Sequence, residues 1–350
     1  MDIRQLLTET VQMKASDLHL CPGQPPKIRV NGDIVNLNST ALDKETIEQM
    51  LKEVTNEKQL QNMKEHLDLD FSFSLPGVSF FRANAFYTRN GLAMVFRAIP
   101  TTPVSLEELD APDIFKDLVA QPRGLILVTG PTGSGKSTTL AAMIDHLNKH
   151  TRQHILTIED PIEFVHQSKK CLINQRELNQ NTLSFHNALK AAMREDPDII
   201  LVGEMRDIET IRLALTAAET GHLVLATLHT TGAAKSIDRI VDVFPGSEKD
   251  MIRTMLSESL IAVISQTLIK TADGKNRVAA HEIMTATPAI KNLIRENKIA
   301  QMNSSIQTGA AFGMQTLDQA LNNLVRQGII TEAAAKDKSS SPGNISKNPT

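Results

Sequence analysis

The alternation of apolar and polar residues takes one form before residue 100 and another after it. The clearest early run, residues 67–75, places Leu or Phe at every odd position and Asp or Ser at every even one. Because successive side chains of a strand point to opposite faces, this period predicts a half-buried strand. Shorter runs predict strands at 17–20, 27–30, 34–37, 79–88 and 92–99, and helical spacing predicts helices at 2–13 and 43–54. We therefore expect an antiparallel α+β domain with one face of its sheet covered.

From residue 124 onward, short apolar runs alternate with longer amphipathic segments. The apolar runs predict strands at 125–129, 155–159, 199–203 and 223–228, and the segments between them predict helices at 136–148, 184–195, 207–219 and 233–241. This alternation is typical of a mostly parallel sheet with helices on both faces, so the fold class is α/β. Further on, the pattern predicts one long helix at 248–268 and several short helices within 288–330.

The boundary between the two patterns is rich in proline. Pro100 and Pro103 fix the backbone φ angle and cannot continue a strand, which favours a linker at this point. We expect a first domain at 1–99, a linker at 100–122 with a helix from 106 to 119, a second domain at 123–335 and a disordered, apolar-poor tail at 336–350.

Composition narrows the class of protein. A length of 350 residues favours two domains, and a net charge of −3 with 3% aromatic residues gives none of the basic or stacking surface that a nucleic-acid motor requires. The two cysteines form no CxxC pair, which excludes a structural zinc site of that kind. With no run of 18 apolar residues, we expect a cytoplasmic protein that reaches a membrane only through a partner.

The stretch 125–139 carries the clearest chemical signal. An apolar strand runs into Gly130–Ser137, which has the pattern G-x-x-x-x-G-K-S, and a helix follows. Such a glycine-rich loop turns its N–H groups toward a phosphate chain. Lys136 would contact the β- and γ-phosphates of ATP, and the Ser137 hydroxyl would bind Mg²⁺. The residues predicted to bind nucleotide are Gly130, Pro131, Thr132, Gly133, Ser134, Gly135, Lys136, Ser137 and Thr138.

Two acidic stretches follow predicted strands. Glu204 ends the apolar run 198–203, where P-loop enzymes hold the magnesium shell, so we expect it to act on Mg²⁺ through water. The stretch 157–164 carries Glu159, Asp160 and Glu163, one of which would orient or deprotonate the attacking water. The pattern does not choose among these three carboxylates, and a solvated acidic turn is the alternative.

Histidines and arginines provide the remaining candidates. His222 and His229 bracket the strand at 223–228, and His229 would sense the γ-phosphate at its carboxyl end; a buried structural histidine is the alternative for each. Arg82 and Arg97 lie on two strands of the first domain, where arginines are usually surface charges. They become functional if that domain covers the nucleotide of another subunit, because arginine stabilises transition-state charge on phosphates.

These stretches together resemble the PilT-type retraction ATPases of type IV pili, within the secretion ATPase superfamily. The matching residues are 15–20, 130–137, 157–164, 196–207, 227–230, 237–240, 278–283, 289–296 and 313–317. The resemblance implies a PAS-like first domain, a RecA-like second domain and a homohexamer with nucleotide between them. It also implies roles for seven residues: Lys136 in the P-loop, Glu163 as catalytic glutamate, Glu204 as the Walker B glutamate, His222 and His229 as the histidine box, and Arg82 and Arg97 as phosphate-reaching arginines.

The resemblance further implies a motor that uses ATP and Mg²⁺ to retract pili and drive twitching motility. Residues 289–296 are similar to the AIRNLIRE signature of retraction, and Lys291, Gly232 and Glu195 depart from the usual family residues. The implied partners are an inner-membrane platform protein and a paralogous retraction ATPase, at the cytoplasmic side of that membrane. The alternatives are a retraction-accessory (PilU-like) ATPase, a pilus-assembly or type II secretion ATPase, a RecA-like nucleic-acid motor, and a scaffold that binds nucleotide without turnover.

Overall fold

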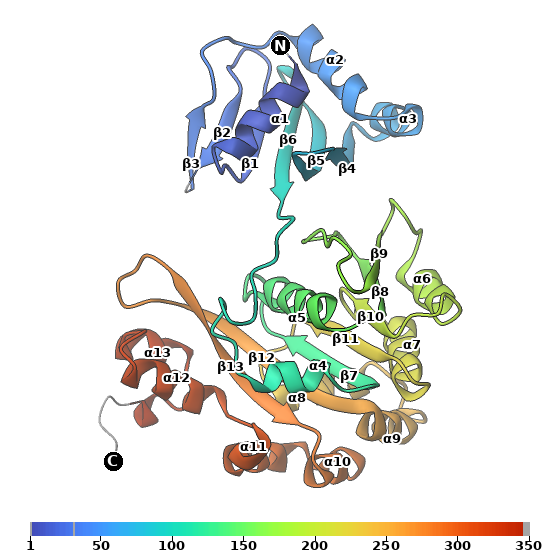
Figure 1. The fold of residues 1–350 in the computed structure, drawn as a ribbon, viewed down its shortest axis with the longest axis vertical. Coiled ribbons are helices and arrows are strands. Elements are labelled where there is room, and N and C mark those ends of the chain that lie inside the picture. The colour runs from blue at the N-terminus through green and yellow to red at the C-terminus, as the bar shows by residue number, and fades with distance from the viewer. Residues whose placement is uncertain (1, 31, 346–350) are drawn as a thin grey trace. The chain divides into compact units, whose positions relative to one another are not determined.

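The computed structural model describes residues 2–30 and 32–345, which divide into two compact units (Figure 1). The first unit comprises Met1–Thr102 together with Glu163–Val165, and the second comprises Pro103–Ile162 and His166–Thr350. No helix in the described part of the chain is long and apolar enough to cross a membrane.

The first unit is built on a six-stranded sheet in which every neighbouring pair is antiparallel. The strand order is β3-β2-β1-β6-β5-β4. Its elements are α1 (Ile3–Gln12), β1 (Asp17–Leu20), β2 (Lys27–Val30), β3 (Asp33–Asn36), α2 (Lys44–Val54), α3 (Glu57–His66), β4 (Asp68–Leu75), β5 (Ser79–Thr88) and β6 (Gly91–Ile99).

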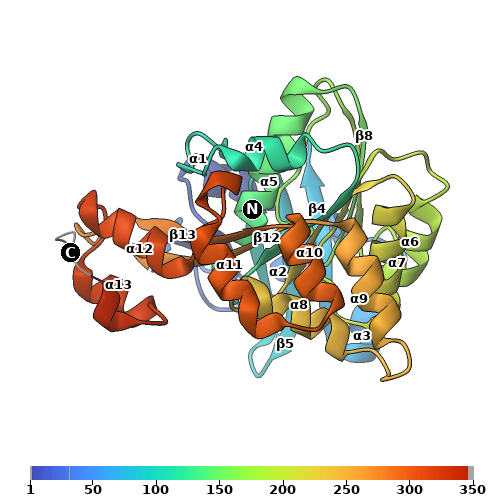
Figure 2. The same ribbon diagram turned by 90° about the horizontal axis from the view of Figure 1, so that it is seen from below.

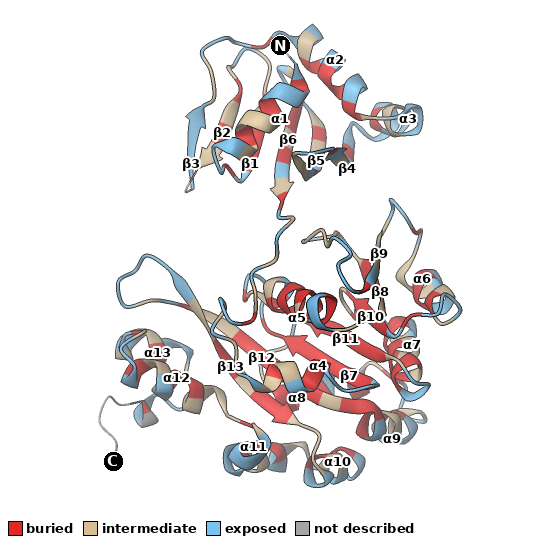
Figure 3. Cartoon of the chain, in the orientation of Figure 1, coloured by how far each residue is buried: buried red, intermediate tan, exposed pale blue. Residues whose placement is uncertain are grey.

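One face of this sheet packs against the three helices. Leu18, Phe81 and Phe96 lie in that core and are fully buried, as Figure 3 shows for the strands they belong to. The sequence pattern misses α3, because Met63 is its only buried residue; its start is fixed instead by a capping box between Asn56 and Gln59. The predicted antiparallel α+β arrangement with one covered face is therefore observed.

The second unit contains a seven-stranded, mostly parallel sheet in the order β13-β12-β7-β11-β10-β8-β9. Only β13 runs antiparallel to its neighbour. The strands are β7 (Gly124–Thr129), β8 (His154–Glu159), β9 (Leu172–Glu177), β10 (Ile199–Val202), β11 (Leu223–Leu228), β12 (Leu260–Lys270) and β13 (Arg277–Thr285). The helices are α4 (Ile114–Val119), α5 (Lys136–His150), α6 (Phe185–Ala192), α7 (Ile208–Glu219), α8 (Ala233–Asp242), α9 (Lys249–Ser259), α10 (Pro288–Arg295), α11 (Met302–Thr308), α12 (Leu317–Arg326) and α13 (Glu332–Lys338). Three short 3-10 turns, Ile299–Gln301, Ala310–Phe312 and Pro342–Asn344, complete the elements of this unit's described part.

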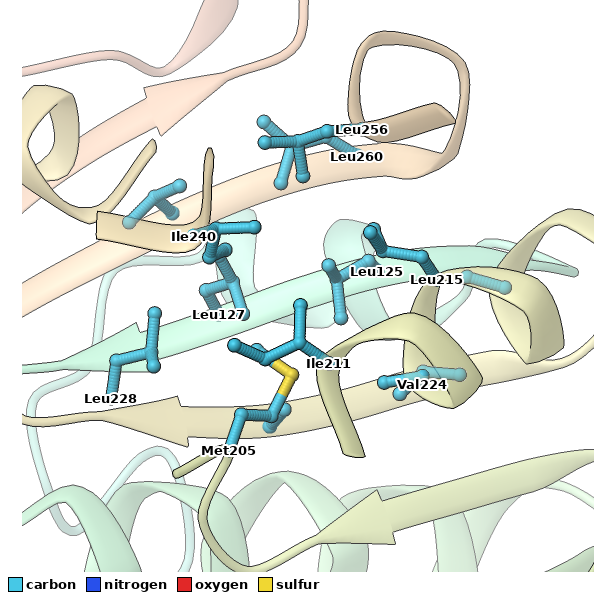
Figure 4. Close-up of a cluster of buried hydrophobic side chains, with 14 of the residues drawn as sticks. Leu125, Leu127, Met205, Ile211, Leu215, Val224, Leu228, Ile240, Leu256 and Leu260 are labelled. Atoms are coloured by element: carbon cyan, nitrogen blue, oxygen red, sulfur yellow. The ribbon is translucent and has the colours of Figure 1, made fainter. Parts of the chain in front are cut away.

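Helices cover both faces of this sheet, as the α/β pattern predicts. Ile126 and Val128 of β7 pack toward α4 and α5, whereas Leu125 and Leu127 pack toward the helices of the other face (Figure 4). On that second face α8, α9, α10 and α11 lie next to one another (Figure 2). The four β7 residues are fully buried, so the strand that leads into the P-loop is held rigidly from both sides.

The predicted long helix at 248–268 is wrong. Helix α9 ends at Ser259, and Leu260 takes up extended backbone to begin β12. From Ala262 the strand pairs with β7 on one side and β13 on the other. Its apolar residues are buried on both faces of a central strand, and such a run also satisfies a helical spacing. Strands β9 and β13 are likewise absent from the sequence-based expectation.

Two further expectations differ from the structure. The helix predicted at 106–119 is confined to α4, because residues 106–110 form turns ahead of it. The tail predicted to be disordered from 336 is helical to Lys338, and Ile345 is buried in the core under α12 and β12. Ser339 and Ser340 also donate hydrogen bonds to Asp318 of α12, so polar and apolar contacts together hold this segment against the unit. Residues 346–350 lie outside the described part of the chain.

Candidate nucleotide-binding site

The P-loop connects the end of β7 to the start of α5. Gly130, Gly133 and Gly135 have φ angles of +142°, +77° and +89°, which side chains on L-residues rarely allow. A Cβ atom at Gly130 would stand 2.3 Å from the carbonyl oxygen of Gln266. The space and the backbone angle together require glycine at Gly130, and the positive φ angles favour glycine at Gly133 and Gly135.

Lys136 is folded into this loop. Its Nζ donates hydrogen bonds to the carbonyl oxygens of Gly130 (2.9 Å) and Pro131 (3.1 Å), and only 8% of the residue is exposed. Burial lowers the pKa of Lys136, and the nearby Glu204 carboxylate opposes that shift. An ammonium held among carbonyl groups at a helix amino end is suited to a polyphosphate.

The loop also carries donors that fit a phosphate. The hydroxyl of Ser134 is buried without a hydrogen-bond partner, and Ser137 is exposed in the first turn of α5. Among the described residues no group of three His, Cys, Asp or Glu side chains could hold a metal ion by itself. A magnesium ion here would therefore need Ser137, nucleotide phosphate oxygens and water as ligands.

Gln266 braces the P-loop from β12. Its Nε2 donates to the Ser134 carbonyl (2.6 Å), and its Oε1 accepts from the Thr139 hydroxyl (2.9 Å), so its amide spans the loop and the first turn of α5. The residue is 3% exposed. Sequence reasoning missed Gln266 because it lies 127 residues from Thr139 in a segment predicted as helix. Its polarity within the apolar run of β12 is the signal that could have found it.

Glu204 follows β10 at the carboxyl end of the sheet. Its Oε2 is 2.8 Å from Arg206 Nη2 and 3.5 Å from His229 Nε2. His229 Nδ1 lies 3.3 Å from the Thr132 hydroxyl of the P-loop. A continuous polar chain thus joins Glu204, His229 and Thr132, which places His229 between the predicted magnesium carboxylate and the loop.

The three carboxylates of the acidic stretch make different contacts. Glu159 accepts hydrogen bonds from Thr157 (2.6 Å) and Gln175 (3.2 Å), which fixes it within the sheet. Asp160 faces the Arg206 guanidinium at 3.7 Å and is thereby connected to Glu204. Glu163 is exposed and belongs to the short segment Glu163–Val165 that clusters with the first unit. Arg206 is a second residue that sequence reasoning missed.

His222 lies apart from this group. It precedes β11, so the six residues of that strand separate it from His229 at the other end. A strand of that length spans roughly 20 Å. Its Nδ1 is 3.0 Å from the carbonyl oxygen of Ala217 near the end of α7. The expectation that both histidines share one catalytic site is therefore not supported for His222, whose observed contact is structural.

Arg82 and Arg97 are cross-strand neighbours in the first unit. They sit directly opposite each other on β5 and β6, and both are exposed. Arg97 Nε is 2.8 Å from Asp17 Oδ1 on β1. The structure thus brings the two predicted arginines side by side within their own unit.

Comparison with known proteins places these features in context. Residues 1–345 match the family model described as type II/IV secretion system protein. A Pseudomonas aeruginosa protein described as type IV pilus retractation ATPase PilT is 60% identical over 345 residues, which cover 99% of this chain and 100% of that protein. A Neisseria gonorrhoeae twitching motility protein is 63% identical over 321 residues, covering 92% and 86% of the two chains. A crystal structure of the pilus retraction motor PilT with bound ADP is 46% identical, covers 98% of both chains and superposes with a TM-score of 0.91.

Proposed function

Because the chain belongs to the type II/IV secretion system protein family, we propose that it is the ATP-hydrolysing motor that retracts type IV pili and drives twitching motility. The resemblance inferred from the sequence is confirmed by relatives named for retraction and twitching over nearly the full chain. The observation that carries the chemistry is the polar chain from Glu204 through His229 to Thr132, beside Lys136 in the glycine loop.

Each residue of this group has a distinct task. Lys136 and the loop N–H groups would bind the phosphates of ATP, with Ser137 as a magnesium ligand. Bound Mg²⁺ would neutralise charge that develops on the phosphates. Glu204 would orient water in the metal shell, and Arg206 holds that carboxylate in place. His229 would detect the γ-phosphate, since it touches both Glu204 and the P-loop.

We assign two further roles, of which the second needs a neighbouring subunit. Glu163 would accept the proton of the attacking water, since its carboxylate is exposed and can reach a substrate. Arg82 and Arg97 would bind phosphates of a neighbouring subunit's nucleotide in a homohexamer. The platform protein of the pilus at the inner membrane and a paralogous retraction ATPase are the partners on which this motor would act or with which it would work.

The chemistry is tested with the purified full chain. We expect magnesium-dependent ATP hydrolysis that Lys136→Ala abolishes, and Glu163→Gln to bind ATP while its turnover falls by about a hundredfold or more. Wild-type turnover in Glu163→Gln would move the proton acceptor to another residue. Asp117→Asn, an exposed change on α4, is the matched control and should leave turnover unaltered.

The cellular function is tested by deleting the gene in the source cell and counting surface pili. Surplus pili that do not retract, together with lost twitching motility, are expected for a retraction motor. Absence of pili would instead identify an assembly motor and overturn the proposal, while normal retraction would favour an accessory ATPase.

A further inference from the structure

The open face of the first unit's sheet carries a polar row that runs across five strands. Residues that are paired directly opposite one another share a face, and the row runs from β2 to β4. Its members are Arg29, Asp17, Arg97, Arg82 and Ser72. The opposite face is the apolar core, so this row is the charged side of an otherwise half-buried sheet.

Asp17 is the buried member of the row. The residue is 3% exposed, its Oδ1 is 2.8 Å from Arg97 Nε, and its Oδ2 accepts a 2.7 Å hydrogen bond from the Ser16 hydroxyl. Arg29 Nε lies 3.9 Å from the same carboxylate. The side chain of Arg97 is 67% exposed, in contrast to the carboxylate that holds it.

Arg97 contacts Asp17 through its Nε atom, while most of its side chain is exposed. Asp17 engages Nε, at the base of the guanidinium, whereas bidentate recognition of a phosphate can use the two terminal amino groups. A side chain as long as arginine otherwise samples many rotamers, and a fixed Nε contact removes much of that freedom. Asp17 therefore sets the direction in which the amino groups of Arg97 project.

The charges of the row are not arranged in a way that stabilises the sheet. Arg82 stands directly opposite Arg97, and like charges in that arrangement destabilise a sheet. One buried carboxylate behind Arg97 partly offsets this repulsion but leaves an excess of positive charge within the row, where three arginines accompany Asp17. Such an excess is suited to an anion that is not part of the first unit.

We propose that Asp17 is a positioning residue for ATP hydrolysis, one that holds the Arg97 guanidinium so that Arg97 and Arg82 meet the phosphates of a neighbouring subunit's ATP. This inference rests on the proposed function. Asp17 itself would not touch nucleotide, and its effect on turnover would pass through Arg97 alone.

A double-mutant cycle in ATP turnover tests this dependence. We expect Asp17→Asn to lower kcat about tenfold with little change in KM, and Arg97→Ala to lower kcat by at least as much. In the Arg97→Ala background, adding Asp17→Asn should change kcat by less than about twofold. Full multiplication of the two effects would overturn the proposal, because a carboxylate that only stabilises β1 would still matter without Arg97.

Two controls keep the result interpretable. Asp70→Asn changes a carboxylate on the same face that accepts a 3.2 Å hydrogen bond from Asn84, and it should leave kcat unaltered. If Asp17→Asn folds poorly, guanidinium ion added at millimolar concentration to the Arg97→Ala protein serves instead. Guanidinium should partly restore kcat of the Arg97→Ala protein and also that of the Asp17→Glu/Arg97→Ala protein, which would support the proposal. No restoration in the Arg97→Ala protein, where Asp17 is intact, would count against it.

The same measurements separate this inference from the proposed function. A wild-type chain that does not hydrolyse ATP would defeat the proposed function. A wild-type chain that hydrolyses ATP, with multiplicative Asp17 and Arg97 effects, would defeat only the positioning role.

Discussion

Replacing Gln266 by leucine tests whether one side chain on β12 holds the P-loop in its binding shape. Leucine has nearly the same volume but neither donates nor accepts hydrogen bonds. The change would leave the Ser134 carbonyl and the Thr139 hydroxyl without the partners they have at 2.6 Å and 2.9 Å. Both contacts are buried, so water would not easily replace the missing amide.

The magnitude follows from these two contacts. Each buried polar group that loses its partner costs about 1–2 kcal/mol, so the combined cost is about 2–4 kcal/mol. Without these contacts the P-loop relaxes in the free protein, and nucleotide must order it again. The cost therefore reduces the free energy of nucleotide binding. Since about 1.4 kcal/mol corresponds to a tenfold change, the Kd for ADP should rise between roughly 30-fold and 700-fold.

The assay is equilibrium binding of ADP by isothermal calorimetry, paired with thermal unfolding of the free protein. Gln121→Leu makes the same substitution at an exposed position in the connection between α4 and β7 and should leave the Kd within about twofold. An unchanged Kd and an unchanged unfolding midpoint for Gln266→Leu would refute the reasoning, since the two lost contacts would then stabilise neither state.

Other substitutions test the remaining parts of the second unit. His229→Ala should lower ATP turnover about tenfold or more by separating Glu204 from the P-loop, whereas His222→Ala should stay within about twofold; equal losses would restore His222 to the site. Burial lowers the pKa of His281 and of His166 to about 4, so both are neutral in the folded state, and each contributes stability that is present above pH 6.5 and falls by about 2 kcal/mol by pH 5. Denaturant unfolding of His281→Leu should therefore show a loss about 2 kcal/mol smaller than that of wild type, and an equal loss in the two proteins would contradict this reasoning. Ile345→Ala should cost the C-terminal cluster about 2–4 kcal/mol and speed limited proteolysis there, and unchanged proteolysis would mean that the tail contributes no stability.

Local chemistry made the nucleotide loop predictable. Gly130, Gly135 and Lys136 lie within seven residues, and the backbone angles they need are encoded in their own types. Glu204 and His229 were predictable for a different reason, because parallel strands bring their carboxyl ends to one edge of the sheet. In both cases the position of the site residue can be derived from one strand and the turn that follows it.

Contacts between distant segments were not predictable in the same way. Gln266 lies on a run whose apolar spacing suits either a helix or a central strand, and only its pairing with β7 and β13 decides between them. For His222, the strand that separates it from His229 was predicted correctly, and what the pattern could not supply is its contact with the carbonyl oxygen of Ala217. Ile345 formed a core contact that composition of the tail could not indicate, because one residue does not alter an average.

Strand β12 contacts both the P-loop and the C-terminal cluster of the second unit. It pairs with β7 only as far as Ser265, opposite Thr129, and beyond that point it pairs only with β13. Gln266, the first residue beyond the pairing with β7, donates a hydrogen bond to the P-loop. Ile269, three residues further on, is buried in the C-terminal cluster. The same stretch of β12 therefore touches the P-loop through Gln266 and the C-terminal cluster through Ile269, so one continuous strand links the nucleotide loop to the C-terminal helices.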